Sequence, residues 1–263
     1  MSAYGIRTGI AGLPGPAGPA ERELRRLDFE FPAEAALPMA ELPDRELHIW
    51  HGHRDEGRPN IPRFLDLLSP EERERLARFR FEPDREDFRF ARGMLRTVLG
   101  HYLGIAPAEV RFSRSRHGKP SLAHPQRASR VQFNLSHTVG YVLVAICLDR
   151  ALGVDVERLR SDLEVEDLAA RFFSSAEKQA IRALPEGERR RAFFHCWTRK
   201  ESLLKAWGGG LLVPLDTFDV SVRPGVERIS LVTRPQAERA RGWRIFDVPV
   251  PEEFAAAVSV ECS

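Results

Sequence analysis

The sequence predicts an α+β protein of two similar lobes related by a pseudo-twofold axis, each with helices packed on a mainly antiparallel sheet. The main observation is a repeated order of elements: a capped helix, a long helix, a glycine stop and then strands, beginning once at Ser69 and again at Ser174. The second is length, because 263 residues with 43% hydrophobic content can form two small domains with real cores. Identity between the two copies is slight, so the predicted duplication depends on element order.

Three segments are expected along the chain. Residues 1–44 form a disordered or irregular extension, because Met1–Ala20 is rich in glycine, proline and alanine and prolines interrupt the residues that follow. Glycine occupies every third place in Gly12–Ala20, but so few triplets cannot form a collagen helix. Residues 45–157 then form the N-terminal lobe and residues 158–263 the C-terminal lobe.

The first folded element is a strand at Leu47–Arg54. His51 and His53 share one face of this strand and could reach a metal, but His48 points the other way. A partly exposed strand is therefore preferred to a metal site.

Two helices follow. The sequence Ser69-Pro70-Glu71-Glu72 is a capping box with proline at the first helical position, and it predicts a helix to about Phe81. Apolar residues at helical spacing predict a longer helix at Asp84–Leu103, which Gly104 ends. Strands are then expected at 110–115, 131–137, 141–148 and 152–157. The short connection at residues 149–151 predicts a hairpin, which places the strand at 152–157 beside the one at 141–148.

The second half repeats this order. A second capping box at Ser174 predicts a helix to about Leu184, and a longer helix at Glu188–Trp207 ends in three glycines. Strands are expected at 218–222, 229–233, 243–248 and 254–261.

Composition excludes several classes of protein. A formal net charge of +2 is too small to indicate a nucleic-acid partner. No apolar stretch approaches the roughly 18 residues of a membrane span, and the N-terminus lacks a signal-type apolar region. Cys147, Cys196 and Cys262 have no metal-type spacing and are interpreted as reduced thiols. A cytoplasmic protein with no membrane contact is expected.

Two short stretches carry the candidate chemistry. On a strand, Asp155 and Glu157 point the same way and repel each other unless a cation lies between them. On a helix, Glu201 and Lys205 lie one turn apart on one face. Each pair alone is more often an ordinary surface pair. Together, three carboxylates and a lysine suit a magnesium ion that is itself bound to a phosphate, provided that the two stretches meet.

A second group of residues indicates phosphate binding. The strand that ends at Ser136 and His137 carries hydrogen-bonding side chains, and Arg114 and Lys119 bring cations to the loop before it. Taken alone, this strand end is equally well explained by polar caps.

Five motifs then occur in a characteristic order: GKP at 118–120, FNLSH at 133–137, GVDVE at 153–157, RFFS at 171–174 and WTRKESLLKAWGGGL at 197–211. In order and approximate spacing, the chain resembles the 4'-phosphopantetheinyl transferases of the Sfp type, which are large pseudo-dimeric monomers. The resemblance runs from about Leu47 to the C-terminus and does not cover residues 1–44.

The resemblance implies a role for each matching residue. The magnesium ligands are Asp155, Glu157 and Glu201, of which Glu157 is the least certain, because some members lack an acid there. The catalytic residues are Glu201, Lys205 and Asp155; Lys205 contacts the coenzyme A phosphate and assists the leaving group. Coenzyme A is bound by Arg75, Arg114, Lys119, Ser136, His137, Asp155 and Lys205. Arg78, Arg89 or Arg92 could replace Arg75, and no role is assigned to Lys200.

The implied activity transfers the 4'-phosphopantetheine arm of coenzyme A to a serine of an apo acyl, peptidyl or aryl carrier protein and releases 3',5'-adenosine bisphosphate. Such a reaction requires positioning and charge neutralisation by Mg²⁺, with Mn²⁺ as an alternative. Glu201 is the favoured acceptor of the serine proton. Arg189–Arg191 is a candidate docking surface for an acidic carrier protein, although a solvated helix start is the preferred interpretation. A monomer is expected.

Two other functions compete with this one. Acidic pairs with a lysine also suit a magnesium-dependent phosphodiesterase or nuclease, but the GKP and FNLSH motifs would have no evident role there. An inactive homologue that only binds coenzyme A or a carrier protein is disfavoured, because all three carboxylates and Lys205 are retained.

Overall fold

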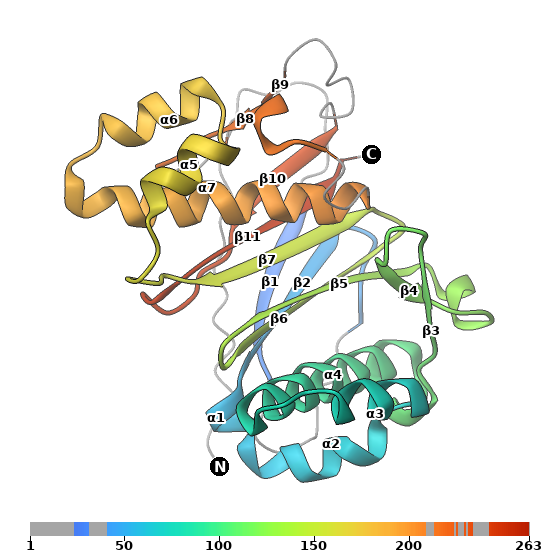
Figure 1. Ribbon diagram of the computed structural model, residues 1–263. Coiled ribbons are helices and arrows are strands. Elements are labelled where there is room, and N and C mark those ends of the chain that lie inside the picture. Colours follow the sequence, from blue (N-terminus) through green and yellow to red (C-terminus); the bar gives the residue numbers. More distant parts are fainter. Residues whose placement is uncertain are drawn as a thin grey trace, which may run out of the picture. The chain divides into compact units, whose positions relative to one another are not determined.

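The computed structural model of the protein describes residues 24–31, 41–208, 213–223, 225, 229, 231–233 and 242–262. The chain forms two compact units (Figure 1). The first runs to Ser113 and continues over Pro120–Asp149, and the second comprises Arg114–Lys119 and the residues from Arg150 onward. Each unit has its own apolar core, so each is described by itself.

The first unit is a sheet with helices on one side. Its strands, in the order β1-β2-β6-β5, are β1 (Arg25–Glu30), β2 (Glu46–His53), β6 (Tyr141–Leu148) and β5 (Val131–Thr138). The β1–β2 pair is parallel and the other pairs are antiparallel. The α-helices are α1 (Arg54–Gly57), α2 (Ile61–Leu67), α3 (Pro70–Ala77) and α4 (Glu82–Leu103). A separate two-stranded sheet pairs β3 (Phe112–Arg114) with β4 (Pro120–Leu122).

Helix α4 supplies much of the first core. Its apolar residues Met94, Leu95 and Val98 are fully buried in a cluster that also contains Trp50 of β2. Gly104 ends the helix in the left-handed conformation, with φ at 65°, which glycine adopts without strain. The predicted helix and its stop at Gly104 are confirmed, although the helix begins at Glu82 and not at Asp84.

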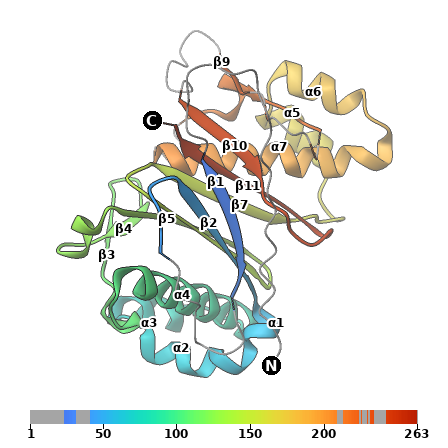
Figure 2. The same cartoon turned by 180° about the vertical axis from the view of Figure 1, so that it is seen from behind.

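The second unit has the same plan. Its main sheet has the antiparallel order β10-β11-β7, formed by β10 (Trp243–Asp247), β11 (Phe254–Glu261) and β7 (Leu152–Arg158). Helix α7 packs along β7 and β11, as Figures 1 and 2 show. The α-helices are α5 (Val165–Phe172), α6 (Ser175–Arg182) and α7 (Glu186–Trp207). Strands β8 (Phe218–Val220) and β9 (Leu231–Thr233) form a second small sheet.

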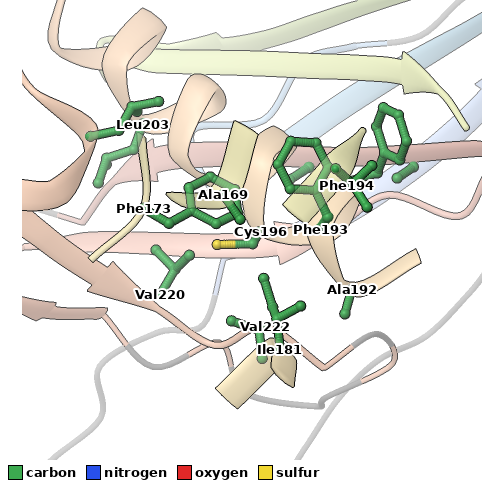
Figure 3. Packing of buried hydrophobic residues seen from close by; sticks show 14 of the residues in the cluster. Ala169, Phe173, Ile181, Ala192, Phe193, Phe194, Cys196, Leu203, Val220 and Val222 are labelled. Atoms are coloured by element: carbon green, nitrogen blue, oxygen red, sulfur yellow. The ribbon is translucent and has the colours of Figure 1, made fainter. Parts of the chain in front are cut away.

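The second core lies against the buried face of α7. Figure 3 shows Phe193 and Cys196 of this helix near Phe173, which lies just after α5. The Phe173 and Phe193 rings are stacked, with their centroids 5.1 Å apart. This packing orients the helix, so its remaining face is directed at β7 and β11.

The predicted duplication is confirmed in element order and extends to sheet topology. The strands β2-β6-β5 of the first unit correspond to β7-β11-β10 of the second, and in both sets the last strand in sequence order is central. Both long helices contain 22 residues and end at a left-handed glycine, Gly104 or Gly208. Both short helices begin with a complete capping box, at Ser69 and at Ser174. Aligning these residues defines equivalent positions in the two repeats.

The predicted hairpin at residues 149–151 is wrong. Strand β7 pairs with β11, where Asp155 lies opposite Ala257, and not with β6. Central strand β6 already has β2 and β5 on its two sides. Strand β7 therefore begins the second repeat, whereas the expected lobe boundary lay after Glu157.

The N-terminal part of the chain also differs from expectation. Residues 25–30, expected to be irregular, form strand β1, which covers β2 so that His48 and His51 are buried. Two expectations were therefore wrong: that residues 25–30 are irregular, and that the strand β2 is partly exposed. Phe29 stacks on Trp50 with ring centroids 4.8 Å apart, which adds an aromatic contact to the backbone pairing of this mostly charged strand. The expectation for residues 1–20 lies outside the described residues.

In the part of the chain that the structure describes, every helix is too short or too polar to cross a lipid bilayer.

Candidate active site

The two predicted stretches meet inside the second unit. The ammonium group of Lys205 on α7 donates a hydrogen bond to Asp155 Oδ1 on β7 over 2.6 Å, and a second to Val154 O over 3.2 Å. The Asp155 side chain is 5% exposed and that of Lys205 is 31% exposed. Strand β7 therefore directs its acidic face at α7, and a buried carboxylate lies next to a partly accessible cation.

Gly153 permits this close approach. A Cβ atom at this position would lie 2.1 Å from Ser202 O and 2.4 Å from Ala206 N, both on the backbone of α7. No side chain fits there without displacing the helix. A glycine inside a predicted strand is a known signal of close backbone approach, so the sequence carried this information.

The carboxylates of the site affect one another. Burial raises the pKa of Glu157 to about 7, with further increases from Asp155 and Glu201 and an opposing effect of Lys205. Burial also raises the pKa of Glu201, as does Asp155, while Lys205 lowers it. Three acids and one cation thus share a partly buried region. An additional cation would relieve the repulsion between the acids.

A magnesium ion fits the chemistry of this set. Mg²⁺ prefers one or two carboxylates, completed by waters and phosphate oxygens. Among the described residues, no group of three His, Cys, Asp or Glu side chains lies close enough to hold a metal ion. The three carboxylates are therefore not arranged as a closed coordination shell in this structure.

Lys200, to which the sequence assigns no role, is fully buried and structural. Its ammonium contacts Glu177 Oε1 at 2.8 Å and donates to Leu215 O at 2.6 Å and to Phe218 O. These partners use all three of its donors. Lys200 thus fixes the turn of α7 that carries Glu201, and its ammonium group uses all its donors within the second unit.

Arg199 forms a second buried anchor that sequence reasoning missed. Its guanidinium donates to both carboxylate oxygens of Asp247 on β10, over 2.8 and 2.6 Å, and also to Ser221 O. Burial opposes the charge of Asp247, but the nearby His195 ring and the hydrogen bonds from Arg199 outweigh it and lower the pKa to about 2. The available signal was an arginine two residues after Trp197, in a helical stretch that also carries Phe193 and Phe194.

The predicted coenzyme A residues fall into two groups. Lys119 and Arg114 belong to the second unit, where the Lys119 ammonium lies at the end of α7. Arg75, Ser136 and His137 belong to the first unit. Arg75 is exposed on α3, with its guanidinium 5.3 Å from the centroid of the Phe88 ring. Ser136 is buried and His137 exposed, as the alternation of strand β5 requires.

The arginines at the start of α7 bind their own unit. Arg189 pairs with Glu166 and donates to Leu184 O, and Arg190 donates to Leu163 O. Arg191 donates to Glu252 O over 3.4 Å. These contacts attach α5 and neighbouring loops to α7, which is a sufficient role for the arginine-rich segment.

Comparison with known proteins identifies the family. Residues 151–259 match the family described as the 4'-phosphopantetheinyl transferase superfamily, and residues 55–148 match the one described as 4'-phosphopantetheinyl transferase, N-terminal. The protein 4'-phosphopantetheinyl transferase HetI of Nostoc sp. is 34% identical over 223 residues, which cover 85% of this chain and 91% of that protein. The chain belongs to the 4'-phosphopantetheinyl transferase superfamily.

Two further relatives agree. The 4'-phosphopantetheinyl transferase Sfp of Bacillus subtilis is 33% identical over 60% of this chain and 68% of its own length. The putative 4'-phosphopantetheinyl transferase slr0495 of Synechocystis sp. is 31% identical over 73% of this chain and 76% of its own length. The resemblance inferred from the five motifs is confirmed, and the protein is an enzyme with 4'-phosphopantetheinyl transferase activity that activates carrier proteins. The competing nuclease and inactive-homologue functions are set aside.

Proposed function

We propose that the acidic face of β7 and the facing turn of α7 bind magnesium and the pyrophosphate of coenzyme A. The single observation that carries the proposal is the contact between Lys205 and Asp155, beside two carboxylates of raised pKa. In this proposal Asp155, Glu157 and Glu201 would hold the ion, which would be magnesium or alternatively manganese. When bound, the ion would neutralise negative charge on the phosphates.

The transfer itself needs few groups from this chain. The serine hydroxyl of an apo acyl, peptidyl or aryl carrier protein attacks the phosphorus that bears pantetheine, and the bond to 3',5'-adenosine bisphosphate breaks. Lys205 places its positive charge at the departing phosphate, which is the function of a lysine in such sites. Glu201 accepts the serine proton, because its raised pKa makes it a better base than an ordinary glutamate at neutral pH.

The nucleotide end of coenzyme A is assigned by the same proposal to Arg75, Arg114, Ser136, His137 and the turn that carries Lys119. Arg114 is exposed, as is His137, so both can reach a ligand from solvent. Guanidinium and imidazolium groups suit the 3'-phosphate. We further propose that the enzyme acts as a monomer.

The test is transfer to a panel of apo carrier proteins, with coenzyme A and Mg²⁺, followed by intact mass spectrometry of each carrier. Addition of the phosphopantetheine arm to at least one carrier is expected, together with release of 3',5'-adenosine bisphosphate. Chelation of the divalent ion should stop the reaction. The absence of transfer to acyl, peptidyl and aryl carriers alike would contradict the proposal.

A further inference from the structure

Lys119 makes contacts that differ from those expected of a ligand-binding lysine. Its ammonium donates hydrogen bonds to Leu152 O over 3.0 Å and to Ala206 O over 3.2 Å. Leu152 begins β7, and Ala206 lies in the last turn of α7. One side chain therefore joins the two elements that carry Asp155 and Lys205, at the end where both are close to the site.

The backbone around Lys119 holds this side chain in place. Ser115 N donates to Lys119 O over 2.9 Å, and Lys119 N donates to Ser115 Oγ over 3.2 Å. Gly118 closes the turn with φ at 84° and donates to Ser115 O. Such a tight turn limits the positions that the lysine stem can reach.

The contact also satisfies the chemistry of a helix end. The last carbonyl groups of a helix have no partner within the helix and carry partial negative charge, so a cation there is stabilising. Gly208 ends α7 in the left-handed conformation, and a Cβ atom there would lie 3.6 Å from Lys119 Cδ. The lysine stem thus lies along the helix terminus while its ammonium binds Ala206 O.

We propose that Lys119 is a positioning residue, which fixes the last turn of α7 against the start of β7 and so holds Lys205 in reach of Asp155. The inference rests on the proposed roles of those two residues. An ammonium group has three donors, and Lys119 uses two of them on backbone carbonyls. Its main contribution is therefore to the geometry of the transfer step and not to the affinity for coenzyme A.

Hydrogen–deuterium exchange of the protein without coenzyme A tests the structural step. In Lys119→Met, the amides of residues 203–208 should exchange about tenfold faster than in the wild type, because the helix end loses its tether. Lys119→Arg keeps a donor and a charge and should restore most of the protection. Arg116→Met removes a charge from the same turn without touching α7, and its exchange should match the wild type.

Steady-state kinetics test the functional step. Lys119→Met should lower kcat about tenfold while the KM for coenzyme A stays within about threefold. A raised KM with unchanged kcat, or unchanged exchange at residues 203–208, would overturn the positioning role and indicate direct ligand contact. If Lys119→Met does not fold, Lys119→Gln is used with the same criteria. Exchange is measured without substrate, so an inactive wild-type enzyme would contradict the proposed function and leave this result unaffected.

Discussion

The two repeats place different side chains at equivalent positions of the strand that faces the long helix. In the first repeat, Trp50 and Gly52 of β2 face α4: the indole of Trp50 donates to Tyr102 Oη over 3.0 Å, and Gly52 lies against Met94. In the second, Asp155 and Glu157 of β7 occupy these places opposite α7. The same strand and helix thus form apolar core in one copy and a candidate site in the other.

A second set of equivalent positions is also apolar in the first repeat and charged in the second. Leu95 and Leu135 belong to the apolar core of the first unit, and the equivalent residues of the second unit are Arg199 and Asp247, which form an ion pair. The register supports the equivalence, because Leu135 and Asp247 lie opposite Val144 and Ala257 on the central strands.

A third feature is conserved between the repeats. The capping-box Glu72 binds Arg96 of α4 over 2.8 Å, and Glu177 binds the equivalent Lys200 of α7 over 2.8 Å. Both cations also donate to carbonyls of the short turn that follows the helix, at Val110 and at Phe218. The helix anchor is therefore common to both copies, whereas the acidic pair on the strand that faces the helix occurs only in the second.

The largest expected effects come from the equivalent pair Asp155 and Trp50. Asp155→Ala should lower the rate of transfer about 10²- to 10³-fold, because the site loses a carboxylate at the point where charge develops in the reaction. Its thermal stability should change little. Trp50→Ala should cost about 3–5 kcal/mol of unfolding free energy. Transfer assays and urea unfolding of both variants measure the contrast. Equal losses of stability in the two variants would show that Asp155 is a core residue like Trp50.

Removing the buried cation that pairs with the capping-box glutamate should cause a large loss of stability in either repeat. Lys200→Met leaves Glu177 buried without its cation and should cost about 3–5 kcal/mol. The double variant Glu177→Gln, Lys200→Met should recover part of this loss, because no charge then remains buried. Denaturant unfolding gives the values, with Arg96→Met as the matched variant in the first repeat. A Lys200→Met enzyme of full stability and reduced transfer would instead assign Lys200 to catalysis.

The glycines that face the long helices predict a smaller difference. Gly153→Ala forces a methyl group against backbone atoms of α7 and should cost about 1–3 kcal/mol, with reduced transfer. In Gly52→Ala the nearest atom is the flexible Met94 Sδ, at 2.5 Å, which can move away more easily. Thermal unfolding of the two variants compares them. A larger loss for Gly52→Ala would contradict the close approach of β7 to α7.

The ion pair between Arg199 and Asp247 predicts that the stability of the protein falls at acid pH. The pKa of Asp247 is about 2 in the folded state and about 4 when unfolded, so its contribution to stability is complete above pH 4 and is lost as the pH falls towards 2. The contribution lost is about 2 kcal/mol. Asp247→Asn should be less stable than the wild type at pH 6, and this difference should shrink at pH 3. A constant difference would contradict the assignment.

The helices and strands that were predicted correctly are those that short stretches of sequence determine. The capping boxes and glycine stops defined four helices, although α3 ends at Ala77 and not at Phe81, and apolar runs located β5, β6 and β7. Short elements were missed: α2 contains only seven residues and α5 eight, too few for a clear period. Strand β1 was missed because most of its residues are charged.

The candidate site was predictable only in part. The acidic strand and the Glu-Lys helix were evident because both patterns are local. The strand that pairs with β7 was not evident, because β11 lies about 100 residues further along the chain. No local pattern indicates which residues of these two strands lie opposite each other. The tether at Lys119 was equally hidden, since a lysine in a turn is usually solvated and only the fold shows that it reaches two carbonyls.

Divalent-ion binding tests the central claim most directly. Mn²⁺ binding in the presence of coenzyme A is followed by electron paramagnetic resonance for the wild type, Asp155→Ala, Glu157→Gln and Glu201→Gln. Saturable binding is expected for the wild type, weakened most by Asp155→Ala and least by Glu157→Gln. Wild-type affinity in all three variants, with thermal stability retained, would contradict the assignment of the metal to the acidic strand of the second repeat.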